Sequence, residues 1–176
     1  MPDVTVALSL VDGLGVFAAR EFEAGETVLF IDDSRVVDTA HPLRPELGEN
    51  EVHCDYLARG KVVLMQPPER CINSSCDPNT YVKTIEGHRR VLARRPIRTG
   101  EEITYDYIIN CHGGAVWECH CGSPRCRRQV PSSFFDLPLA QQLAYLPLLD
   151  DWFVEEHAER VENLRRLVGI GRLKSK

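Results

Sequence analysis

Three cysteines grouped around one glycine constrain this chain more than any other feature. Cys119, Cys121 and Cys126 fall within eight residues, and Gly122 allows a tight turn between them. Zinc in proteins takes four tetrahedral ligands, mostly thiolate or imidazole, and one short loop can supply several of them. The residues alone leave the fourth ligand open among Cys54, Cys71, Cys76, Cys111, His112 and His120. A metal site is favoured over the alternative of buried, inert thiols.

The size and charge of the chain narrow its class. It has 176 residues, enough for one domain or for one domain with an added helical segment. Its net charge of −5 disfavours direct nucleic-acid binding, and no apolar run approaches the roughly 20 residues of a membrane span. Asp3 stands where a secretion signal would carry basic residues. We therefore expect reduced thiols in an intracellular, reducing compartment, with nucleus and cytoplasm not distinguished.

The first two thirds of the chain alternate short β-branched or apolar runs with turn signals. This pattern predicts short strands and almost no helix before residue 136. The proline-containing stretch 38–50 is expected to be a loop. The expected strands lie at 4–8, 15–18, 27–31, 56–57, 61–65, 81–85, 89–93 and 102–107.

The last forty residues carry a helical pattern instead. Leu139, Leu143 and Leu146 share one helix face, and Pro147 separates them from a second apolar stripe at 154–168. Such a face must be buried somewhere. We expect it to pack on the domain; covering an active site and forming a homodimer are the alternatives.

Three further motifs are weak when each is taken alone. The Gly-Leu-Gly at 13–15 is typical of a hairpin turn, because it lacks the third glycine and the helix of a dinucleotide site. The segment 70–79 is rich in turn formers, and 100–107 looks like an ordinary strand end.

Together and in this order, the motifs resemble those of the SET-domain protein lysine methyltransferases with a post-SET zinc module. The resemblance covers residues 4 to about 128. It implies a mostly β fold with some α, in which small curved β-sheets surround a pseudoknot-like crossing of 73–79 with 100–107. The expected division is a SET domain at 4–110, a post-SET zinc segment at 111–130 and a C-terminal helical extension at 131–176.

The resemblance also implies roles for individual residues. Tyr107 matches the catalytic tyrosine, and Tyr105 occupies a position where tyrosine goes with mono- or dimethylation. Cys76 becomes the expected fourth zinc ligand, beside the three clustered cysteines. The residues expected at the methyl donor S-adenosylmethionine are Gly13, Leu14, Gly15, Tyr56, Asn73, Ser74 and Tyr107.

The implied substrate is a lysine in a basic protein, with histones as one such class, and the acidic net charge suits it. The protein would act as a monomer or as a homodimer through its C-terminal helices. Ser74 departs from the family, which usually has histidine there. That departure keeps open a non-catalytic SET-like interaction module, and a zinc-stabilised domain unrelated to methyl transfer is a third hypothesis.

Overall fold

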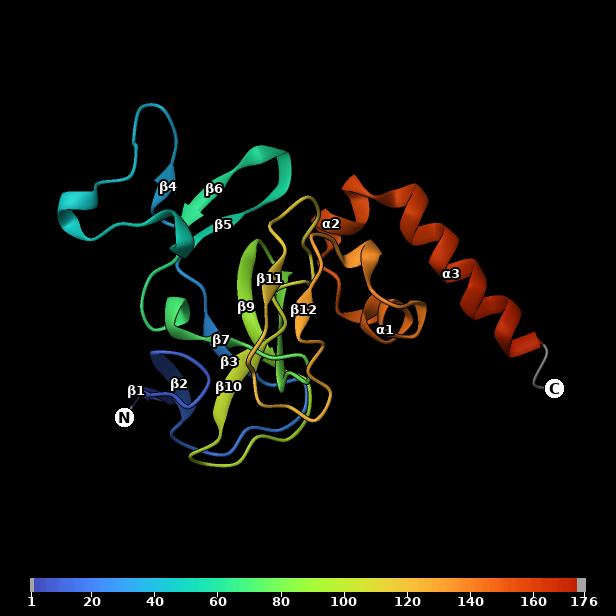
Figure 1. Ribbon diagram of the computed structural model, residues 1–176, viewed down its shortest axis with the longest axis horizontal. Helices are drawn as coiled ribbons and strands as arrows, with labels where there is room; N and C mark the ends of the chain where they lie inside the picture. Colours follow the sequence, from blue (N-terminus) through green and yellow to red (C-terminus); the bar gives the residue numbers. More distant parts are fainter. Residues whose placement is uncertain (1, 174–176) are drawn as a thin grey trace.

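The computed structural model describes residues 2–173, with side chains described through residue 167. Within the described residues, four small sheets occupy positions 4–130, and the α-helices that follow gather on one side of the view (Figure 1). The prediction of a mostly β fold with a helical C-terminal end is confirmed. In the described residues, no helix is both long and apolar enough to cross a membrane.

The largest sheet joins segments from both ends of the predicted domain. Its strand order is β1-β2-β10-β7, in which β10 is antiparallel to β2 and parallel to β7. Its inward side chains, among them Val16 and Ile103, are fully buried. The bounds are Val4–Leu8 for β1, Leu14–Ala18 for β2, Asn73–Ser74 for β7 and Glu102–Tyr105 for β10.

Two three-stranded sheets flank this one, and a two-stranded ribbon follows. The first sheet has the order β3-β9-β8 and the second β4-β6-β5, while β11 and β12 form the ribbon. The loop predicted at 38–50 holds a single short 3₁₀ turn at Pro45–Leu47. The bounds are Thr27–Phe30, His88–Ala93 and Thr80–Ile85, then Val36–Val37, Val62–Leu64 and Cys54–Tyr56, then Trp117–Glu118 and Gln129–Val130.

Three helices close the chain. They are α1 (Leu139–Tyr145), α2 (Asp151–Glu156) and α3 (Ala158–Leu173). The apolar stripe predicted at 154–168 is split at His157, whose backbone lies outside the helical region. The His157 ring packs against Phe153 and His112, with centroids 4.5 and 4.8 Å apart. The Val168 end of that stripe lies outside the residues with described side chains.

The helices bury their apolar side chains within the same chain. Phe153, Val161 and Leu164 join one core with Cys76 and Cys119. A second core, around Val16, Phe22 and Ile72, lies under the N-terminal sheets. The described part of the extension is thus packed on the domain, as expected, and its core reaches the clustered cysteines.

Candidate active site and metal centre

The two segments predicted to cross do meet. Tyr105 at the end of β10 pairs with Ser74 of β7, in parallel register. The side chain of Asn79 fixes the same crossing, because its Oδ1 accepts from the Thr104 N–H at 2.9 Å and its Nδ2 donates to the Glu102 carbonyl at 2.8 Å. Asn79 is almost fully buried, so these hydrogen bonds are shielded from water.

The glycine turn lies directly against this crossing. Asn73 Nδ2 donates to the Leu14 carbonyl at 3.1 Å and to Glu102 Oε1 at 2.9 Å. Gly13 has a φ of +45°, in the region that favours glycine. A Cβ at Gly15 would lie 2.5 Å from Glu102 Oε1, so glycine is required there. Of the residues predicted at the cofactor, the structure thus brings together Gly13, Leu14, Gly15 and Asn73. The other three, Ser74, Tyr56 and Tyr107, are described below.

Glu102 is a site residue that the sequence analysis missed. Its carboxylate accepts from Asn73 and also from the Ser9 hydroxyl, at 2.8 Å, so it connects the β1–β2 turn to the crossing. The signal available in the sequence was the second acidic residue of Gly100-Glu101-Glu102.

The two predicted catalytic tyrosines form a pair at the end of β10. The Tyr105 and Tyr107 ring centroids are 5.0 Å apart, with planes inclined by 49°. The Tyr107 hydroxyl donates to the Ile72 carbonyl at 2.6 Å, and its backbone N–H donates to Ser74 Oγ at 3.3 Å. The Tyr105 hydroxyl lies 3.9 Å from Met65 Sδ. Ser74, the unusual residue, therefore helps to hold Tyr107.

Both phenols keep their protons at neutral pH. Burial raises the pKa of Tyr107 to about 12, and burial raises the pKa of Tyr105 above its ordinary range as well. Neutral hydroxyls can donate and accept hydrogen bonds without placing a charge in the site.

A cavity of about 820 Å³ opens beside the tyrosine pair, and both rings line it. Tyr56 lies on its wall, more than half exposed, and donates its hydroxyl to Glu51 Oε1 at 3.1 Å. Among the described residues, Tyr56 makes no hydrogen bond to the glycine turn. The structure therefore groups Tyr56 with the cavity and with Tyr105 and Tyr107.

The C-terminal extension supplies one wall of this cavity, so it packs on the domain and also resembles the alternative in which it covers a site. Trp152, Glu156 and His157 of α2 and its end line it, opposite residues of β5. Glu156 Oε1 also accepts from the Arg59 backbone N–H at 2.7 Å, so the β5–β6 connection touches α2 at one edge. The cavity is thus bounded by the sheets on one side and by the extension on the other.

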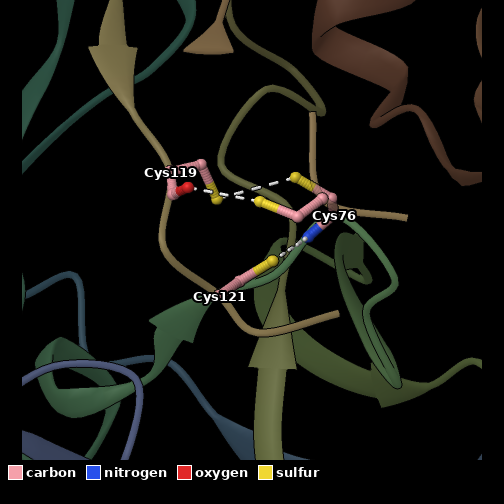
Figure 2. Close-up of side chains that lie close together, drawn as sticks. Cys76, Cys119 and Cys121 are labelled. Carbon is pink, nitrogen blue, oxygen red and sulfur yellow. Dashed lines mark hydrogen bonds between the residues drawn. The ribbon is translucent and has the colours of Figure 1, made fainter. Parts of the chain in front are cut away.

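Four cysteine sulfurs converge behind the crossing. Cys76, Cys119, Cys121 and Cys126 place their Sγ atoms within 4.8 Å of one another, and Cys76 Sγ is 3.6 Å from Cys119 Sγ. Figure 2 shows Cys119 and Cys121, from one loop, turned toward Cys76 of another segment. A tetrahedral zinc with bonds of about 2.3 Å would hold its sulfurs about 3.8 Å apart, so this donor set fits a structural zinc ion.

The surroundings of the four thiols differ in their effect on protonation. Burial raises the pKa of Cys76 above its ordinary range. At Cys121 burial acts in the same direction, but the backbone N–H groups of Cys76 and Ser123 outweigh it and lower the pKa to about 7. A thiol must lose its proton to bind metal, so metal binding here would release protons.

The other candidates for the fourth ligand lie elsewhere. Cys54, Cys71 and Cys111 are outside the cluster as free thiols. His112 Nδ1 is 2.7 Å from Ser133 Oγ, and His120 is exposed beside Glu118. Among the described residues, the fourth sulfur is therefore that of Cys76.

Trp117 contacts both the tyrosine pair and the C-terminal core. Its ring centroid is 6.4 Å from that of Tyr107, and its half-buried side chain packs against the core beneath the cysteines.

Comparison with known proteins agrees with this geometry. The chain is 34% identical over 130 residues to the histone-lysine N-methyltransferase ASHH3 of Arabidopsis thaliana, covering 67% of this chain and 35% of that protein. It is 31% identical over 143 residues to trithorax of Drosophila virilis, covering 72% of this chain and 4% of that protein. Human histone-lysine N-methyltransferase 2B is 30% identical over 136 residues, covering 71% and 5%.

The chain spans only a minor part of the length of these relatives. The stronger statement comes from a family model described as the SET domain, which matches residues 13–108. That match covers more than half of the 176 residues and contains the glycine turn, the crossing and both tyrosines. This chain belongs to the SET domain family.

Proposed function

We propose that this protein transfers a methyl group from S-adenosylmethionine to the side-chain amine of a lysine in a basic protein. The observation that carries the proposal is the position of Tyr107. Its hydroxyl is bonded to Ile72, next to the residue that holds the glycine turn, and its ring also lines the cavity. The Tyr107 side chain thus lies between the expected cofactor turn and the cavity that is open to a substrate.

The residues of this chain would orient a neutral amine and keep water away from it. S-adenosylmethionine, when bound, would supply the electrophilic methyl on a sulfonium sulfur. Tyr105 and Tyr107 present neutral hydroxyls within one pocket wall, and their π-faces suit the positive charge nearby. Positioning of this kind accounts for much of the rate of a two-centre displacement.

The acceptor lysine has a pKa near 10.4 in water and must lose its proton first. An apolar, partly enclosed cavity favours the neutral amine. Carboxylates at its rim, from Glu51, Asp55 and Glu156, would attract the charged form and the basic residues around it. A basic protein is therefore the expected substrate, and the names of the relatives make a histone the first one to test.

Four converging thiols support a structural zinc ion in this proposal. Such an ion would hold the segment that carries Cys119, Cys121 and Cys126 against Cys76, just behind the crossing. The ion would have no part in the chemistry, because a site closed by four protein ligands leaves no open position.

Ser74 is the departure from the family pattern that kept a non-catalytic module open. Its hydroxyl accepts from the Tyr107 backbone N–H, so the substituted position still contributes to the site. This contact favours the enzyme over the interaction module.

The test is cofactor binding followed by transfer. Purified protein, reduced and supplied with zinc, is titrated with S-adenosylmethionine by calorimetry and then incubated with labelled donor and either core histones or a whole-cell lysate. Binding with labelled lysine in the products is expected. Absence of cofactor binding by zinc-loaded, folded protein would contradict the enzyme and leave the interaction module.

A further inference from the structure

Asp106 is a buried carboxylate that stands between the two tyrosines. It is only 1% exposed. Arg127 forms a bidentate ion pair with it: Nη1 donates to Oδ2 at 2.8 Å and Nη2 donates to Oδ1 at 2.7 Å. The Tyr145 hydroxyl also donates to Oδ2, at 3.0 Å. An ionised carboxylate buried this deeply is tolerated only when it is paired and hydrogen-bonded.

Both donors, Arg127 and Tyr145, follow the segment 13–108 that the family model matches. Arg127 directly follows Cys126, and its backbone N–H points at Cys76 Sγ, at 3.4 Å. Tyr145 is the last residue of α1, and its hydroxyl also lies 3.3 Å from the Cys76 carbonyl. The thiol cluster and the helical extension therefore meet at this one carboxylate.

Asp106 lies where β10 ends, so its anchored side chain affects the path of the backbone into Tyr107. The β10 ladder ends at Tyr105, whose carbonyl accepts from the Ser75 N–H at 3.1 Å. Two residues further on, the backbone N–H of Tyr107 donates to Ser74 Oγ at 3.3 Å. Between these two points strand pairing stops, so the anchored side chain of Asp106 sets the direction in which the chain continues into Tyr107.

We propose that Arg127 and Tyr145 are positioning residues that act through Asp106 to hold Tyr105 and Tyr107 at their separation and inclination. The proposal rests on the proposed methyl transfer and extends it, because it makes the extension after residue 130 part of the catalytic apparatus. Neither residue lines the cavity, and Asp106 is the group through which both reach the segment between the two tyrosines.

Two conservative variants test this proposal. Arg127→Lys keeps the charge but removes the two-point grip, and Tyr145→Phe keeps the buried ring but removes the hydroxyl. Arg20→Lys is the matched control, because Arg20 also pairs with two carboxylates, Asp3 and Glu26, but at the surface. Each protein is checked for zinc content and melting temperature before kinetics.

The expected result is a loss in kcat with little change in KM. Misplacing the tyrosines by a fraction of an ångström should lower kcat about ten- to hundredfold, while KM for peptide and Kd for S-adenosylmethionine stay within about twofold. The double variant should lose less than the product of the two single losses, because both residues act on one carboxylate. A purely structural role would instead lower the melting temperature and leave the kcat of the folded enzyme unchanged.

A second readout does not depend on activity. The chain has five tyrosines, so ring-labelled protein gives few tyrosine resonances, and Tyr107→Phe assigns the one of interest. A Tyr107 resonance shifted in Tyr145→Phe and unmoved in Arg20→Lys supports the positioning role, even if the wild-type protein transfers no methyl group and the proposed function fails. Unchanged kcat and an unmoved Tyr107 resonance in zinc-loaded Arg127→Lys and Tyr145→Phe would overturn the inference.

Discussion

The Tyr107 hydroxyl donates a 2.6 Å hydrogen bond to the main-chain carbonyl of Ile72. Ile72 is almost fully buried, and it directly precedes the asparagine whose side chain holds the glycine turn. The phenol is therefore bonded to the same rigid segment that shapes the expected cofactor site. Its proton is engaged with the carbonyl, which leaves its lone pairs free to face a ligand.

Replacing Tyr107 by phenylalanine removes this hydroxyl and keeps the ring. We expect kcat to fall by about a hundredfold or more, because the acceptor amine loses its orienting group. The Kd for S-adenosylmethionine, measured by calorimetry, should stay within a few fold. A variant that keeps more than half of the wild-type rate would show that the hydroxyl is dispensable.

Replacing Tyr105 by phenylalanine should change the product more than the rate. Its hydroxyl lies 3.9 Å from the weak acceptor Met65 Sδ, so it is available to hold a water beside the amine. Without that water there is room for a further methyl group. Mass spectrometry of the modified peptide should show mono- and dimethyl-lysine from the wild type and a shift toward trimethyl-lysine from the variant. An identical distribution from both proteins would refute this role.

Alanine at Gly15 should damage cofactor binding selectively. The added Cβ would lie 2.5 Å from Glu102 Oε1, and that carboxylate cannot simply move aside, because Asn73 and Ser9 both donate to it. We expect the Kd for S-adenosylmethionine to rise by about tenfold or more, measured by calorimetry.

Gly48→Ala is the matched control for that experiment. Gly48 has a φ of +77° with open space around its Cβ position, so alanine there costs about 1 kcal/mol in strain without touching the turn. Equal losses of cofactor affinity in both variants would point to general destabilisation and away from a local cofactor site.

Motifs located much of this site because their residues act locally. Three clustered cysteines come from one short segment whose residue types already match their chemistry, whereas the glycine turn, Asn73, the two tyrosines and Cys76 were assigned through the resemblance of the ordered motifs. The strands were predictable for a similar reason, since alternation and turn residues are local signals. The break between α2 and α3 at His157 was not predicted; the His157 ring packs against His112 and Phe135, which are distant in the sequence.

Polar contacts between residues far apart in the sequence could not be predicted from sequence patterns. Arg127 and Tyr145 reach Asp106 across 21 and 39 residues, and neither position belongs to a periodic pattern. Arg89 lies in the run His88-Arg89-Arg90, which suggests an exposed strand, yet its side chain is buried against acidic partners. Such residues are recognised only when the fold shows which opposite charge meets them.

Removing one thiol of the cluster should reduce the zinc content and the thermal stability of the protein. Cys126→Ser removes one of four converging sulfurs and leaves too few ligands for a closed zinc site. We expect the zinc content, measured by atomic emission, to fall from about one ion per chain toward zero, and the melting temperature to drop by several degrees or more. Cys54→Ser, outside the cluster, is the control and should keep its zinc. Full zinc retention in Cys126→Ser would place the metal elsewhere.

The buried carboxyl of Glu69 should make stability fall as the pH rises. Glu69 is 2% exposed, and neither of its carboxylate oxygens has a hydrogen-bond partner among the residues that the structure describes. Arg89 lies at 3.7 Å, but its donors are directed to Asp33 and Asp55. Burial therefore raises the pKa of Glu69 from its ordinary 4.5 to about 8, and Arg89 offsets this only in part.

The sign of the effect follows from proton uptake. Between pH 4.5 and 8 the folded state holds the Glu69 proton while the unfolded state has lost it, so the free energy of unfolding decreases by up to about 1.4 kcal/mol per pH unit. This contribution is complete below pH 4.5 and is lost as the pH rises through about 8. Glu69→Gln removes the titrating group and keeps the size of the side chain.

Urea unfolding at a series of pH values measures the difference between the two proteins. The stability of Glu69→Gln relative to wild type should increase steadily from pH 5 to pH 8, by a few kcal/mol in total. Glu86→Gln, an exposed carboxylate in the turn between β8 and β9, should not reproduce that slope. Comparing variants at each pH cancels the titration of all other groups, including the cysteines. A pH-independent difference for Glu69→Gln would mean that its carboxyl is ionised in the folded protein and is compensated by Arg89.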